Sequence, residues 1–204
     1  MTAAQSPMPT RRACLALPAA LALAGAPARA ATAPASFIRE TGAALVHVLN
    51  GPDPEAAKRA ALQQIIDSRV DVDGIARFCL GRFWHGATPS QRQEYEALFR
   101  RVLVLNVTAK VGAYKGVSFT IGRVVRRAEG TLVATTVTRP GQPPAEVDWL
   151  VKPVDGHDRI IDVVAEGTSL RVTQRSDYAS YITRHGGDVA ALITALRHQV
   201  GEAG

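Results

Sequence analysis

The sequence predicts an α+β fold, in which helices wrap on a twisted, mainly antiparallel sheet of four to five strands. Three observations indicate this. Apolar residues recur at helical spacing from about residue 37 to residue 113, the period changes to two at Val117, and helical spacing returns from residue 176. A chain of 204 residues favours one domain, expected at residues 31–204 once a removable N-terminal segment is set aside.

Four helical segments should precede the sheet. The first carries an apolar face at Phe37, Ile38, Leu45, Val48 and Leu49, and Asn50-Gly51-Pro52 ends it. A second runs to about residue 69 and a short third ends at Leu80-Gly81. Thr88-Pro89-Ser90-Gln91 has the form of a capping box and begins the longest helix, at about residues 89–113. The apolar stripe of this longest helix is expected to face the sheet.

Four strand-like runs with alternating apolar residues follow, at 117–125, 131–138, 145–152 and 159–165. Their short connections, including a strong hairpin signal at Asp155-Gly156, predict an antiparallel meander. The alternation leaves one apolar face for helices to cover. A fifth extended piece at 168–173 fits the pattern, and two helices are expected at 176–185 and 188–200.

The first thirty residues have the parts of a secretory signal peptide in their usual order. Arg11 and Arg12 precede an uncharged run rich in Ala and Leu, and Ala28-Arg29-Ala30 offers a small-x-small cleavage site. The run is shorter than the roughly 20 residues of a membrane-spanning helix, so export with cleavage near Ala30 is favoured over a retained anchor. Thr10-Arg11-Arg12 leaves the twin-arginine route open beside the general one. Residues 31–36 should form a short flexible start.

The charge of the chain argues against nucleic acid as a partner. The formal net charge is +6, and removal of Arg11, Arg12 and Arg29 would lower it to +3. The remaining basic residues are scattered, with the densest cluster at Arg123, Arg126 and Arg127, and no nucleic-acid-binding motif is present. A weak attraction to anionic lipid head groups or to an acidic partner remains open.

The sequence contains no motif that marks an active site or a metal site. No two of its five histidines stand at the i, i+4 spacing of metal ligands, and H-E-x-x-H, C-x-x-C and G-x-S-x-G are absent. We therefore expect no catalytic residue, no metal and no cofactor. Asp158 and Asp162 would share a strand face as a possible acid/base pair, although a turn residue and a hydrogen-bonded carboxylate explain them more simply. Cys79, left alone by cleavage, should be a small buried hydrophobe.

Three stretches resemble the Mla-type toluene-tolerance family of periplasmic phospholipid-binding proteins. The first is Leu80-Gly81-Arg82-Phe83-Trp84 followed by Thr88, Gln91-Arg92 and Phe99. The second is Tyr114-Lys115-Gly116, and the third is Asp162-Val163-Val164-Ala165-Glu166-Gly167-Thr168-Ser169-Leu170. Their order and spacing agree over roughly residues 37–200. The sequence is also similar to the branch of this family associated with hopanoid biosynthesis.

The resemblance implies an apolar cavity between helices and sheet that holds lipid acyl chains, and no catalysis. It implies a monomeric periplasmic carrier that exchanges phospholipid, or a hopanoid, with an inner-membrane ABC-type transporter complex and an outer-membrane lipoprotein complex. Two alternatives remain: a small cavity-bearing α+β enzyme that uses Asp162 or Asp158 as a base, and a periplasmic adaptor without a ligand. The residues expected to line the lipid cavity are Phe78, Phe83, Leu103, Val107, Tyr114, Phe119, Trp149 and Val163.

Overall fold

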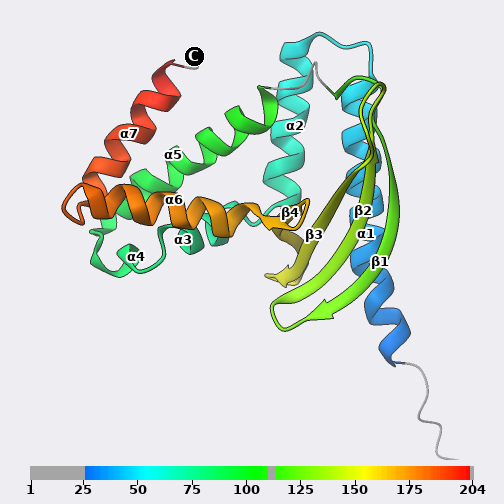
Figure 1. The fold of residues 1–204 in the computed structure, drawn as a ribbon, viewed down its shortest axis with the longest axis horizontal. Helices are drawn as coiled ribbons and strands as arrows, with labels where there is room; N and C mark the ends of the chain where they lie inside the picture. The colour runs from blue at the N-terminus through cyan, green and yellow to red at the C-terminus, as the bar shows by residue number, and fades with distance from the viewer. Residues whose placement is uncertain (1–25, 110–113, 203–204) are drawn as a thin grey trace, which may run out of the picture.

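The computed structural model describes residues 26–109 and 114–202, and it confirms the α+β class (Figure 1). The predicted signal peptide lies outside the described residues apart from 26–30. The helices are α1 (Ala26–Asn50), α2 (Glu55–Arg69), α3 (Val72–Leu80), α4 (Phe83–Gly86), α5 (Pro89–Thr108), α6 (Leu170–Arg184) and α7 (Val189–Glu202). The strands are β1 (Ser118–Arg127), β2 (Gly130–Thr138), β3 (Ala145–Val154), β4 (His157–Ala165) and β5 (Thr168–Ser169).

The five strands form one antiparallel sheet in sequence order, β1-β2-β3-β4-β5, as the short connections predicted. The β3–β4 hairpin turns at Asp155 and Gly156, whose φ angles are 49° and 78°. Both angles lie in the left-handed region that a tight hairpin turn requires and that Asp-Gly tolerates. The four predicted strand runs therefore match β1 to β4 to within a few residues at their ends.

Helices α3, α5, α6 and α7 pack on one another beside the sheet, and we call this part the helical layer (Figure 1). Its centre is an aromatic cluster in which the rings of Tyr95, Phe99 and Tyr178 lie 5.9–6.4 Å apart. Tyr95 is fully buried, and its hydroxyl donates a hydrogen bond of 2.9 Å to the Ala76 carbonyl. The predicted capping box at Thr88 and Gln91 begins α5.

Helix α1 lies along one face of the sheet, behind β1 and β2 in Figure 1. Ile38 of α1 is buried against Val133, Val151 and Ile160, which point to the same face from β2, β3 and β4. This α1–sheet layer has a hydrophobic cluster of its own, separate from that of the helical layer. Val70, at the end of α2, packs against both clusters.

The expectation that the helix predicted at about residues 89–113, now α5, faces the sheet was wrong, because α1 takes that place and is also the longer helix. α5 packs instead on α2, α3 and α7, where Tyr95, Leu98, Phe99 and Val102 are buried. Hydrophobic periodicity shows which face of a helix is buried, but it does not show which element covers that face.

Several element boundaries also differ from the expectation: α5 ends at Thr108 rather than near residue 113, and the short α4 was not predicted. Residues 31–36 belong to α1 rather than to a flexible start. α6 begins at Leu170, because the Ser169 hydroxyl caps it by accepting a hydrogen bond from the Val172 N–H, and this limits β5 to two residues. Within the described ranges, no helix has the length and apolar character needed to cross a membrane.

Candidate functional site

A cavity of about 210 Å³ lies between α1 and the sheet. Its walls come from α1, from the segment that leads into β1, and from β1, β2 and β3. With the exception of Thr41 and Gly42, every lining residue carries a large apolar or aromatic side chain. The lining residues are Ile38, Thr41, Gly42, Leu45, Val46, Leu49, Tyr114, Val117, Phe119, Val137, Val147 and Trp149.

The cavity follows from the apolar spacing of α1 and from the alternation of the strands. Each pattern places apolar side chains on one face of its element, and these two faces oppose each other. Along α1, the lining residues from Ile38 to Leu49 are spaced by three or four, so they form one stripe on the helix. In the sheet, Phe119 pairs with Val137, and Trp149 pairs with Val133 of the cluster under α1. Directly paired residues in an antiparallel sheet share a face, and this face is the one that α1 covers.

The Thr41 hydroxyl and the Trp149 indole N–H at the cavity have partners within the protein. The Thr41 hydroxyl donates to the Phe37 carbonyl at 2.8 Å. The Trp149 indole N–H donates to the Thr135 hydroxyl at 3.0 Å, and that hydroxyl donates to the Val147 carbonyl at 2.7 Å. These groups need nothing from a ligand, so the cavity is suited to an apolar guest.

Gly42 and Phe119 make a close contact across the cavity. A Cβ atom at position 42 would lie 2.2 Å from Cζ of Phe119, far inside van der Waals contact. A glycine within a helix costs about 1 kcal/mol relative to alanine, and here its missing side chain provides the space for the phenylalanine ring. The ring of Phe119 therefore lies directly on the backbone of α1.

One end of the cavity, which we call the Tyr114 end, approaches solvent. Ile38 and Thr41 are buried at the other end, whereas Leu49 and Tyr114 are half-buried and their neighbours Asn50 and Lys115 are exposed. The Asn50 side chain fixes this end: its amide donates to the Val117 carbonyl at 3.0 Å, and its Oδ1 accepts from the Gly116 N–H at 2.7 Å.

The structure brings Tyr114, Phe119 and Trp149 of the predicted lining together at this cavity. The other five predicted residues lie elsewhere. Phe83 and Leu103 pack against the helical core, Val163 packs against the sheet cluster, and Val107 is 43% exposed on α5. The sequence analysis missed the α1 wall because it placed the helix predicted at about residues 89–113 against the sheet. The apolar spacing of Leu45 and Leu49 was nevertheless visible in the sequence.

Phe78, the remaining predicted residue, lies between two arginines. The guanidinium carbons of Arg171 and Arg175 lie 4.3 and 4.9 Å from its ring centroid. Both arginines come from α6, so the Phe78 ring of α3 serves as a contact between α3 and α6.

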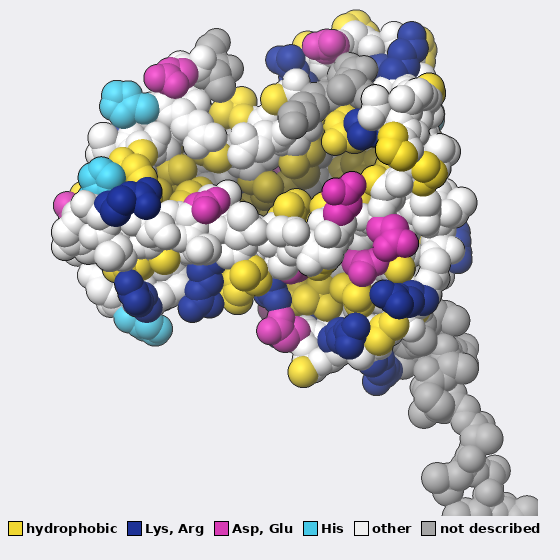
Figure 2. Space-filling view, viewed as in Figure 1, with side chains coloured by type: hydrophobic (Ala, Val, Ile, Leu, Met, Phe, Trp, Pro, Cys, Tyr) yellow, Lys and Arg dark blue, Asp and Glu magenta, His cyan; other side chains and the backbone are white. Residues whose placement is uncertain are grey.

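A second apolar feature is a hollow between α7 and α2 that runs along α5, where Figure 2 shows hydrophobic side chains gathered at the surface. α5 carries the exposed Val107 and the half-buried Leu103 and Val104. This surface is where the predicted lining residues Leu103 and Val107 could meet a ligand, so it is a second location to test.

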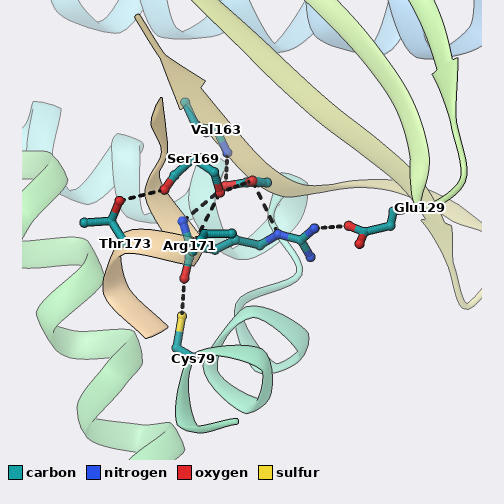
Figure 3. Close-up of polar contacts among 8 residues, drawn as sticks. Cys79, Glu129, Val163, Ser169, Arg171 and Thr173 are labelled. Atoms are coloured by element: carbon teal, nitrogen blue, oxygen red, sulfur yellow. Dashed lines mark hydrogen bonds and ion pairs between the residues drawn. The ribbon is translucent and has the colours of Figure 1, made fainter. Parts of the chain in front are cut away.

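The segment from Asp162 to Leu170 forms a joint between β4 and α6. Asp162 is 4% exposed; its Oδ1 accepts from the Val163 and Arg171 N–H groups, and its Oδ2 accepts from the Ser169 hydroxyl. The Arg171 side chain forms ion pairs with Asp162 and Glu129. Figure 3 shows Ser169, Arg171 and Val163 in this arrangement, with Glu129 at the far end. These contacts give Asp162 a structural role.

The expectation that Asp158 and Asp162 share a face was wrong. Ile160 pairs with Val151, but Asp162 pairs with the adjacent Leu150, so Ile161 is an extra residue in β4. A bulge of one residue reverses the alternation of side chains, which places the two carboxylates on opposite faces of the sheet. They cannot act together as an acid/base pair.

Cys79 is buried in the helical layer, as expected of a small hydrophobe. Burial raises the pKa of its thiol from 9.0 to about 12; Arg171 lowers the pKa by a smaller amount, and Asp162 adds slightly to the increase. The thiol therefore stays protonated near neutral pH and is a poor nucleophile. No group of three or more His, Cys, Asp and Glu side chains that could hold a metal occurs in the described part of the chain.

A helical layer, a five-stranded antiparallel meander and a helix over an apolar cavity together define the class: an α+β protein with an internal site for an apolar guest. The chain belongs to the MlaC protein family, whose sequence model matches residues 39–198. Its fold is also similar to the solved structure of a phospholipid-binding protein from Ralstonia solanacearum in complex with a phospholipid. The TM-score is 0.71 and the sequence identity 20%, with 82% of this chain and 97% of that chain covered.

Proposed function

We propose that this protein is a periplasmic lipid carrier that holds phospholipid acyl chains in the α1–sheet cavity. Membership of the MlaC protein family and the similar fold of a protein solved with a phospholipid support a role in binding and transport rather than in catalysis. The observation that carries the proposal is the cavity itself, whose lining is apolar and whose polar groups are satisfied.

The size of the cavity implies that it widens when it takes up a lipid. Its volume of about 210 Å³ is below the roughly 300–1,000 Å³ of most ligand pockets. The lining runs along α1 from Ile38 to Leu49, about 16 Å of helix at 1.5 Å per residue, which suits the long dimension of an acyl chain. The cavity is long enough for an acyl chain but too narrow. Rotation of the Phe119 ring away from Gly42 would widen it.

Energetically, a carrier must roughly match the bilayer from which it takes its cargo. Each buried CH₂ group contributes about 0.8 kcal/mol in either environment, so a dry cavity makes extraction feasible and an equally dry membrane makes release feasible. Such exchange needs no covalent step. The proposed partners are an inner-membrane ABC-type transporter complex and an outer-membrane lipoprotein complex. The transporter complex would supply the energy that gives lipid transport its direction. A hopanoid is the alternative cargo.

The first test is to identify what the exported protein carries, by native mass spectrometry and lipid extraction. A stoichiometric diacyl phospholipid supports the proposal, and a hopanoid would support the carrier function with the other cargo. A folded protein that neither contains lipid nor takes it up from vesicles would contradict the proposal and favour the adaptor.

A pair of substitutions locates the lipid. Leu45→Trp should fill the α1–sheet cavity and lower the bound lipid several-fold, because an indole occupies space that an acyl chain would need. Val107→Trp adds the same group to the exposed surface of α5, and we expect the lipid content to stay unchanged. Circular dichroism checks that both variants fold. The reverse result would place the lipid in the hollow along α5 and would contradict the assigned location.

A further inference from the structure

The Tyr114 end of the cavity has a cationic side chain at its rim. The guanidinium carbon of Arg139 lies 5.0 Å from the ring centroid of Tyr114, which lines the cavity. Arg139 is half-buried and follows β2, two residues after the lining residue Val137. An arginine stacked on a lining aromatic ring is suitably placed for a ligand that extends out of the cavity.

The loop that carries Arg139 is held against the rim. A Cβ atom on Gly116 would lie 2.8 Å from Cγ of Pro140, so the backbone of Gly116 and the proline ring are in close contact. Asn50 fixes the other side of Gly116, as described above for this end of the cavity. The position of Arg139 is therefore defined by packing on both sides of the rim.

The charge at this rim is not neutralised within the protein. Among the residues that the structure describes, neither Arg139 nor the exposed Lys115 forms an ion pair with an acidic side chain, whereas Arg100, Arg171 and Arg197 do. Lys115 directly follows Tyr114 in the chain. An apolar cavity that ends at an unneutralised guanidinium matches an amphiphile with apolar tails and an anionic head.

We propose that Arg139, supported by the ring of Tyr114 and assisted by Lys115, forms a head-group site for the phosphate of a bound phospholipid. This inference rests on the proposed function and extends it by naming the head-group chemistry. A guanidinium presents its N–H groups in a fork that matches two phosphate oxygens, and stacking on an aromatic ring reduces its freedom before the ligand arrives. The site would favour phospholipid over an uncharged lipid with identical acyl chains.

The test is a competition between phosphatidylglycerol and diacylglycerol of the same acyl composition. The wild-type protein is equilibrated with vesicles that contain both lipids, and the ratio of the two in the protein is measured by extraction and mass spectrometry. Arg139→Gln should lower the ratio of phospholipid to diacylglycerol about fivefold, the upper range for a charge interaction that remains partly hydrated. Arg139→Lys should give an intermediate ratio, because the charge stays and the planar fork is lost.

Arg127→Gln is the matched control, with the same change of charge. Arg127 is exposed at the end of β1 next to the β1–β2 turn, whereas Ser118 begins the strand near Tyr114. About nine strand residues separate the two ends, or roughly 30 Å. This variant should keep the wild-type ratio. An equal fall in both variants would show an effect of net charge and would overturn the assignment.

The remaining outcomes are also distinct. Arg139→Gln protein that folds, binds lipid and keeps the wild-type ratio would overturn the head-group site and leave the carrier function intact. Wild-type protein that takes up neither lipid would overturn the carrier function itself. Replacing chloride with excess inorganic phosphate at equal ionic strength should leave the ratio unchanged, because the acyl chains hold the lipid phosphate in place. A ratio lowered as far as that of Arg139→Gln would show that Arg139 takes free phosphate in preference to the held lipid, and would overturn the lipid head group as its preferred ligand.

Discussion

The helical layer and the α1–sheet layer solve the problem of burying apolar side chains in different ways. In the helical layer, Tyr95, Ala76, Cys79 and Ile182 are each at most 1% exposed, and the aromatic rings contact one another directly. In the α1–sheet layer, Leu45, Val46, Leu49 and Phe119 are only half-buried and surround a cavity. Both layers are apolar, but the core around Tyr95 is filled by contacting rings, whereas the α1–sheet layer surrounds a cavity.

This difference separates stability from binding. Well-packed side chains gain dispersion contacts that residues around a void do not make, so the helical layer should contribute more free energy of unfolding per residue. The α1–sheet layer gives up part of that energy and keeps space for a guest. The same sequence feature, an apolar stripe, therefore serves two purposes, depending on what packs against it.

The largest expected effect comes from truncating one side chain in each layer. Tyr95→Ala should lower the free energy of unfolding by about 4 kcal/mol, because it leaves a large void and removes the buried hydrogen bond to the Ala76 carbonyl. Leu45→Ala should cost about 1 kcal/mol, because the residue already borders a cavity. Urea unfolding of both variants measures the difference, and equal losses would remove the distinction between the layers.

A smaller effect is expected at the joint between the layers. Asp162→Asn should lower the free energy of unfolding by about 2 kcal/mol, because an amide cannot accept from Ser169 and Arg171 as a carboxylate does. Asp158→Asn, on the opposite face of the sheet, should stay within about 0.5 kcal/mol of wild type. If both variants kept wild-type stability, the network around Asp162 would not be what joins β4 to α6.

The smallest effect is a pH dependence that belongs to the helical layer. Below roughly pH 9 the Cys79 thiol is protonated in both the folded and the unfolded state. Above it the thiol ionises only in the unfolded chain, since burial raises the folded pKa to about 12. Stability should therefore fall as pH rises, by about 1 kcal/mol up to roughly pH 9.5.

The control for this prediction is Cys79→Ala, which should remove the slope in that interval while lowering stability overall. Burial also raises the pKa values of Tyr95 and Tyr178, but an unfolded tyrosine ionises only near pH 10, so these residues contribute above that pH. An unchanged slope in the alanine variant would show that another group titrates.

The sequence predicted the local structure well because local signals determine it. The Asp155-Gly156 turn, the capping box at Thr88 and the alternation in four strands each depend on neighbouring residues, and the structure contains all of them. The segment from Asp162 to Leu170 supported the family resemblance, but its role as a joint between β4 and α6 became clear only from its hydrogen bonds.

The errors came from contacts that are remote in sequence. The extra residue at Ile161 is not visible in the sequence pattern, because Ile160 and Ile161 are both apolar. It places Asp158 on the opposite face of the sheet from Asp162, contrary to the expectation. The apolar stripe of α5 likewise did not show which elements would pack against that helix. The sequence assigned Tyr114, Phe119 and Trp149 to a cavity. They line the one beneath α1 because the start of β1 and the middle of β3 border the face of the sheet that α1 covers.

Val70 has a consequence for how this protein could change over evolutionary time. It packs against both hydrophobic clusters and forms a single bridge with Ile160, while the Asp71 N–H donates to the Ile160 carbonyl at 3.0 Å. Because the two clusters have Val70 in common and otherwise consist of different side chains, substitutions in the α1 wall are felt little by the aromatic cluster around Tyr95. Mutations that reshape the cavity for a bulkier or shorter guest can therefore accumulate on α1 and β1 without eroding the scaffold, which makes this architecture a favourable starting point for divergence in cargo.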